Sequence, residues 1–168
     1  MSKLVLAVAA LALAAPAAAQ ERPQFGIGVS ITPEAAFSPT VEAYVPITFG
    51  QLRIEPSLGI FTADNDDGPD TSDITLGVGA FYLQRMAPAA DLYFGGRLKL
   101  NFAHQDDFPG DDSGTDFLIA AAIGGEYYLV SRLSLGAEAQ LGFYSESEVS
   151  GDDSGVFTTG LGFLRFYF

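Results

Sequence analysis

Apolar residues alternate with polar or small residues along most of the chain after the first twenty positions. This period of two indicates β-strands, because successive side chains point to opposite faces of a strand. The alternation falls into eight segments, most of them about nine to thirteen residues long. Their alternating apolar positions span residues 25–31, 41–47, 52–60, 74–82, 92–102, 117–129, 133–143 and 164–168. The pattern predicts an all-β fold.

The first twenty residues follow a different pattern. Lys3 precedes a short run of leucine, valine and alanine, and Pro16 separates that run from three alanines. A positive charge, a short apolar core and small residues predict a secretory signal peptide that is cleaved after Ala19. The apolar run is too short for a membrane-spanning helix, which takes roughly 20 residues. The sequence therefore predicts a signal peptide at residues 1–19 and one domain at residues 20–168.

The connections between the predicted strands alternate in length. Short connections are predicted at residues 49–51, 85–91 and 130–132, and long ones at residues 32–40, 63–73, 104–116 and 145–156. Short turns on one side and long loops on the other are typical of outer-membrane barrels. The sequence predicts an eight-stranded antiparallel up-and-down transmembrane β-barrel. Pro46 and Pro56 lie inside predicted strands and predict a bulge or a shorter strand, because proline cannot donate a ladder hydrogen bond.

The second face of the predicted strands is polar, and this distinguishes a membrane barrel from a soluble one. Its charged residues are Glu42, Arg53, Glu55, Arg97, Lys99, Glu126, Glu138 and Arg165. Their charges sum to zero, as a poorly hydrated barrel interior requires. Glycine and alanine recur on the same face, which suits a narrow lumen filled by long side chains. We therefore predict that all eight charges point inward and pair, with Arg97 and Glu138 in the central layer.

Aromatic residues gather at both ends of the predicted strands. Phe61, Phe102, Phe117, Phe143 and Phe157 lie near the long loops, and Phe49, Tyr82, Phe94, Tyr127, Phe166 and Phe168 near the short turns. Two such belts are expected where a barrel crosses the two membrane interfaces.

The chain ends in mid-strand, with Leu164, Phe166 and Phe168 at alternate positions and Phe168 as the last residue. In this ending it resembles the small eight-stranded outer-membrane β-barrels of Gram-negative bacteria, although Gly160 and Gly162 depart from the larger apolar residues usual there. The resemblance implies a location in the outer membrane, contact with its lipid and lipopolysaccharide, and a last strand recognised by the barrel-assembly machinery. Periplasmic chaperones are further implied partners.

Acidic residues dominate the predicted long loops, which contain no lysine or arginine. The net charge of −13 makes nucleic acid an unexpected partner, and the absence of cysteine excludes disulfides and thiolate metal sites. The candidates for a loop cation site are Asp64, Asp66, Asp67, Asp111, Asp112, Asp152 and Asp153. Neighbouring carboxylates suit Ca²⁺ or Mg²⁺. The simpler interpretation is solvated turn chemistry without any cofactor.

The function predicted from these features is a non-enzymatic outer-membrane barrel with a structural, envelope-integrity or surface-interaction role. One alternative is a narrow, low-conductance pore lined by the interior charges, although an eight-stranded lumen is usually filled by side chains. A further alternative is a lipid A-modifying enzyme centred on His104, the only histidine, with Ser113 close in sequence.

Overall fold

The computed structural model describes residues 24–32, 41–63, 70–105 and 113–168, so the predicted signal peptide lies outside the described residues. Nine β-segments occur within these ranges: β1 (Gly26–Ile31), β2 (Val41–Tyr44), β3 (Ile47–Phe49), β4 (Leu52–Ala63), β5 (Thr71–Ala87), β6 (Ala90–Gln105), β7 (Ser113–Val130), β8 (Leu133–Ser145) and β9 (Ser154–Tyr167). Nowhere in the described ranges is there a helix long and apolar enough to span a membrane.

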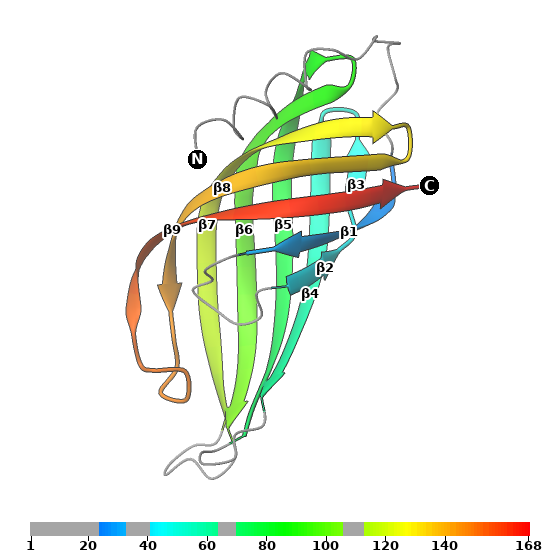
Figure 1. Cartoon of the computed structure of the whole chain (residues 1–168). Coiled ribbons are helices and arrows are strands. Elements are labelled where there is room, and N and C mark those ends of the chain that lie inside the picture. The colour runs from blue at the N-terminus through cyan, green and yellow to red at the C-terminus, as the bar shows by residue number, and fades with distance from the viewer. Residues whose placement is uncertain (1–23, 33–40, 64–69, 106–112) are drawn as a thin grey trace, which may run out of the picture.

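The segments form one closed antiparallel barrel (Figure 1). Each of β4 to β8 pairs with the next segment along the chain, and β9 also pairs with β1. Segment β1 pairs with β2, while β2 and β3 both pair with β4, so these two short segments act as one interrupted strand. This arrangement confirms the predicted eight-stranded barrel.

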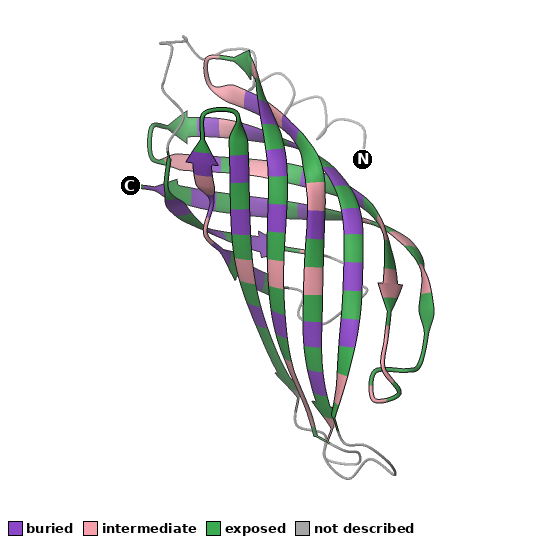
Figure 2. Ribbon diagram, turned by 180° about the vertical axis from the view of Figure 1, so that it is seen from behind, coloured by how far each residue is buried: buried purple, intermediate pink, exposed green. Residues whose placement is uncertain are grey.

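Buried and exposed residues alternate along the strands, as Figure 2 shows from behind. The outward-facing positions carry large exposed apolar side chains, among them Ile27, Leu76 and Leu164. The inward-facing positions carry buried charges such as Arg53, Glu55 and Arg165. This is the polarity of a membrane barrel, because an Arg or Lys facing lipid near the midplane would cost about 2–4 kcal/mol.

The interruption between β2 and β3 falls at Val45 and Pro46, and Pro56 lies opposite it. The Pro56 carbonyl accepts a hydrogen bond from the Val45 amide at 3.0 Å, so its nitrogen faces the same gap. The Pro46 carbonyl accepts one from the Gly26 amide at 3.2 Å. The two prolines therefore share a single break in the ladder, and β4 continues through Pro56 without interruption.

Several strands extend further than the alternation of apolar residues alone predicted. The predicted connection at residues 85–91 is wrong in extent, because β5 and β6 continue to a tight turn at Pro88 and Ala89. At the opposite end, β5 begins at Thr71, β7 at Ser113 and β9 at Ser154, so the predicted loops there are also shorter. The strands continue because polar residues extend the alternation of inward-facing and outward-facing side chains beyond the last apolar positions.

Aromatic rings cross the lumen above glycines that leave room for them. A β-carbon at Gly28 would meet the ring of Tyr44, and one at Gly124 would meet the ring of Tyr93. Phe157 is an exception to the predicted outer belt. It packs beside Tyr144 against the buried pair Leu118 and Ala120. Side chains therefore fill the lumen.

The last strand closes the barrel against β1, and the final residue of the chain extends that contact. The Phe168 amide donates a 3.1 Å hydrogen bond to the Phe25 carbonyl, and the two rings stack with centroids 5.7 Å apart. Leu164, Phe166 and Phe168 all face outward and are exposed. The predicted assembly signal therefore lies on the outer wall, beside β1.

Candidate functional site: the barrel interior and its outer mouth

The interior layer near the short turns is built around one carboxylate. Glu126 accepts hydrogen bonds from Arg53 at 2.6 Å and from Arg165 at 2.8 Å through the same oxygen. Its other oxygen accepts from the hydroxyls of Ser134 at 2.5 Å and Tyr167 at 2.6 Å. Glu126 comes from β7, and its four donors come from β4, β8 and β9. One side chain therefore ties four strands together.

Aromatic faces complete the surroundings of Arg165. Its guanidinium carbon lies 3.9 Å from the centre of the Phe163 ring and 5.2 Å from that of Tyr44. Within the described residues, the Arg165 Nε and the Tyr44 hydroxyl are the two buried side-chain polar atoms without a hydrogen-bond partner. Cation–π contacts offset part of the cost of burying this charge.

The central layer joins Arg97 to two carboxylates. Arg97 donates to Glu138 at 2.7 Å and 2.8 Å, and to Glu55 at 3.0 Å. Glu55 also accepts from Arg165 at 2.6 Å, which connects this layer to the one below. Glu138 accepts further hydrogen bonds from Tyr93 and Gln140. The Arg97–Glu138 pair thus lies in the middle of the lumen, where the sequence placed it.

The outer layer contains the remaining charged pair and a third carboxylate group. Lys99 contacts Glu42 at 2.5 Å, and this pair is slightly more exposed than the pairs below it. Further out, Asn101 links Thr75 to Asp116 through hydrogen bonds of 2.8 Å and 2.9 Å. The structure therefore places all eight predicted interior charges in the lumen, and each has a partner of opposite charge.

Two further carboxylates that are fully buried in the interior, Asp91 and Asp116, were assigned to connections by the sequence reasoning. Asp91 pairs with Arg85 at 2.6 Å near the short turns, and Asp116 is fully buried near the long loops. The alternation along each strand could have identified both residues as inward-facing. Asp91 is two positions from inward-facing Tyr93, and Asp116 is two positions from inward-facing Leu118.

The loop between β8 and β9, residues 146–153, folds onto the inner face of β7 through Asp116. The Ser147 amide and hydroxyl each donate to one oxygen of Asp116 at 2.8 Å. The Ser150 hydroxyl donates to the other oxygen at 2.7 Å. With Asn101, four hydrogen bonds satisfy this buried carboxylate. We call this contact the loop latch, and it covers part of the outer mouth of the barrel.

Glu146 is the first residue of the latched loop, and the other acids there affect its pKa. Partial burial raises its pKa, and the charges of Asp116 and Asp153 add to the shift. Because this pKa is higher in the docked loop than in a free chain, the docked loop holds the proton more tightly. Its contribution therefore favours docking at acidic pH and is lost as the pH rises through the raised pKa.

Replacing Gly114 with valine is expected to open the loop latch. The side chain of Ser147 occupies the position that a β-carbon on Gly114 would take, and Val149 lies 3.5 Å away. Losing the charged hydrogen bonds to Asp116 should accelerate amide exchange at Ser147 by about tenfold or more. Hydrogen–deuterium exchange with mass spectrometry measures this change.

The matched control for the loop latch is Gly162→Val, since a β-carbon there meets no atom within 4 Å. Equal exchange rates in the two valine variants would show that the latch does not protect the loop.

The predicted loop cation site has no support from geometry in the described part of the chain. Asp152 and Asp153 are exposed, and Asp152 occupies a left-handed backbone conformation with φ of 54°. No group of three or more His, Cys, Asp or Glu residues suited to a metal occurs among the described residues. The other candidates, Asp64, Asp66, Asp67, Asp111 and Asp112, lie outside those residues.

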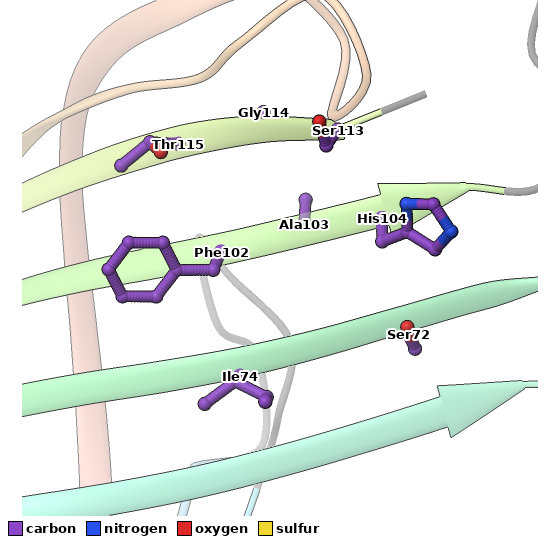
Figure 3. Close-up of a pocket in the computed structure, with 8 residues that line it drawn as sticks. All are labelled: Ser72, Ile74, Phe102, Ala103, His104, Ser113, Gly114 and Thr115. Carbon is purple, nitrogen blue, oxygen red and sulfur yellow. The ribbon is translucent and has the colours of Figure 1, made fainter. Parts of the chain in front are cut away.

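His104 lies on the outer wall near the long loops. It is opposite Ser72 of β5 and Ser113 of β7 in the strand register. The three residues border a hollow of about 420 Å³, which Figure 3 shows with Phe102, Ile74 and Thr115 in the next row. Ser113 was predicted to lie near His104 because the two are close in sequence, but Ser72 was not predicted to lie beside them.

The family profile described as "Outer membrane protein beta-barrel domain" matches residues 4–164, almost the whole chain. The chain belongs to this outer-membrane β-barrel family. Membership places it in the bacterial outer membrane and confirms the predicted family. No match was found among curated protein sequences.

Two solved barrels show the same fold as this family member. Neisserial surface protein A superposes with a TM-score of 0.60 at 18% identity, covering 86% of this chain and 97% of that one. Ail, the attachment invasion locus protein of Yersinia pestis, superposes with a TM-score of 0.53 at 16% identity, covering 87% and 100%. The Ail structure contains the heparin analogue sucrose octasulfate.

Proposed function

We propose that this family member is a closed, non-enzymatic barrel that acts through its exposed loops and its lipid-facing wall. The observation that carries the proposal is the interior network, in which Arg53, Glu55, Glu126 and Arg165 are each at most 2% exposed. Such a network fills the cross-section of a narrow barrel. It supports a role in envelope integrity or surface interaction over a role in transport.

The acidic loops point to the chemistry of a surface partner. Ail was crystallised with a sulfated polyanion, but the predicted long loops of this chain carry many carboxylates and no lysine or arginine. A polyanion would be repelled, whereas a basic protein surface would be attracted at low ionic strength. We propose a cationic partner for the loops.

Export would remove residues 1–19, and the assembly machinery would recognise the strand ending in Phe168.

Catalysis at His104 has less support. His104 and Ser113 are opposite each other, as a base and a nucleophile would need to be. Apart from His104, the residues that line the hollow are apolar, small or hydroxyl-bearing. The hollow is also open toward the membrane. These features fit a contact surface better than a catalytic site.

Planar-bilayer conductance tests the closed lumen. The folded wild-type barrel is expected to produce no steady channels, because buried ion pairs block the path. Changing Arg53, Glu55, Glu126 and Arg165 together to serine removes this network without changing the net charge and should produce measurable conductance. The heat-dependent shift in electrophoresis shows that both proteins are folded. Steady wild-type channels as large as those of the opened variant would contradict the proposal.

A further inference from the structure

The outer half of β9 has one edge that no described strand covers. Segment β1 pairs with β9 from Tyr167 to Gly162 and ends there, at Ile31, whereas β8 pairs with β9 as far as Ser154. Residues 154–161 therefore have β8 on one side and no described strand on the other, and Figure 1 shows β1 running beside only the C-terminal part of β9. We call this uncovered side the open edge. An unpaired strand edge is a template for another extended chain.

The backbone groups on the open edge follow from the hydrogen bonds at the end of β9. The Tyr167 amide donates to Arg132, on the β8 side, and the Phe168 amide donates to Phe25, on the β1 side. These directions alternate along an antiparallel strand, and the register between β8 and β9 has no shift. The amide and carbonyl groups that point toward the open edge are therefore those of Val156, Thr158 and Gly160.

The exposure of side chains agrees with a missing neighbour strand. Val156 is 75% exposed, the highest value among the large apolar side chains of the described residues. Leu164 and Phe166 face outward on the part of β9 that β1 flanks, and they are 46% and 45% exposed. Pro33, two residues beyond the end of β1, has no amide hydrogen with which to continue the β1 ladder at Gly160. These observations favour a strand from another chain.

The open edge belongs to the part of β9 nearest the long loops. Beyond Leu164 the outward-facing residues of β9 are small or polar except for one, and they are Gly162, Gly160, Thr158, Val156 and Ser154. An unpaired sheet edge is not stable in hydrocarbon, and this composition fits the water interface instead. A soluble partner can reach the open edge there.

The charges beside the open edge favour a cationic partner. Glu148, Asp152 and Asp153 are exposed in the loop that leads into β9. The predicted long loops contain no lysine or arginine to neutralise them. Lysine or arginine on an added strand would be attracted to these carboxylates, whereas the same edge of a second copy of this chain would be repelled.

We propose that the open edge binds an extended segment of a second protein, carrying lysine or arginine, as an added β-strand. Val156, Thr158 and Gly160 hold the segment by backbone hydrogen bonds, and the loop carboxylates select its charge. The proposal rests on the cationic partner proposed for the loops, and it names the surface that receives that partner.

Calorimetric titration of the folded barrel in detergent with a synthetic peptide of alternating lysine and valine tests the open edge. The peptide is expected to bind. A peptoid with the same side chains has the same charge but no backbone N–H, so it should bind at least about tenfold more weakly. Equal binding of peptide and peptoid, or binding of neither, would overturn the open edge. Equal binding would leave the cationic partner standing, whereas tighter binding of a glutamate–valine peptide would contradict the cationic partner itself.

Thr158→Pro makes the matching change in the barrel. It removes one amide donor from the open edge and none from the ladder to β8, because the Thr158 amide points away from β8. Peptide binding should weaken by about tenfold or more. Thr158→Val is the matched control, since it removes the hydroxyl and keeps the amide, and it should bind the peptide as the wild-type barrel does.

Both Thr158 variants should keep the heat-dependent electrophoretic shift of a folded barrel. Unchanged peptide binding by the folded proline variant would overturn the proposal. If that variant does not fold, the comparison of peptide and peptoid on the wild-type barrel decides.

Discussion

Replacing Glu126 with leucine is expected to lower the free energy of unfolding by about 3–5 kcal/mol, because it removes the carboxylate that two buried guanidinium groups share. Arg53 loses its shortest ion pair, and Arg165 keeps only Glu55. Ser134 and Tyr167 lose their acceptor as well. Denaturant unfolding in lipid vesicles, followed by circular dichroism, measures the change.

Glu148→Leu is the matched control for Glu126, since it makes the same chemical change at an exposed loop position. A surface substitution of this kind is expected to change stability by less than about 0.5 kcal/mol. If the two leucine variants unfold at the same denaturant concentration, Glu126 is not the centre of the lower layer.

The interior charges were predictable from the sequence because a strand offers only two faces. Once apolar side chains face lipid, every intervening charge must face the lumen, as Glu55 and Arg97 do. The central position of Arg97 and Glu138 followed from their distance to the strand ends. The extra contact between Arg97 and Glu55 depends on the stagger between distant strands, which the alternation of residues does not encode.

The loop latch was not predictable for a different reason. Asp116 and Ser147 are 31 residues apart and meet because a loop folds back over a neighbouring strand. In the sequence, residues 146–153 are a polar turn with two adjacent aspartates, which is equally typical of a free surface loop. The row of Ser72, His104 and Ser113 likewise required the register of three strands whose ends were not known.

Arg97→Met and Glu138→Leu are each expected to lower the free energy of unfolding of the barrel. The sum of these two losses should exceed the loss measured in the double variant. Each single change leaves the other charge of the central layer without its main partner, whereas the double change removes both charges. The coupling energy should lie within about 0.5–3 kcal/mol, as for other contacting pairs. Glu55 retains Arg165 as a partner in the double variant, so no new unpaired carboxylate forms there.

Lys99→Met combined with Glu138→Leu is the control cycle, because Lys99 pairs with Glu42 and contacts neither Arg97 nor Glu138 through a described ion pair. These two changes should be additive within about 0.5 kcal/mol. Additivity in the Arg97–Glu138 cycle as well would mean that the two side chains contribute independently to stability. Coupling in that cycle alone would mean that the central layer is held as a unit, since a charge there is tolerated only while its partner remains.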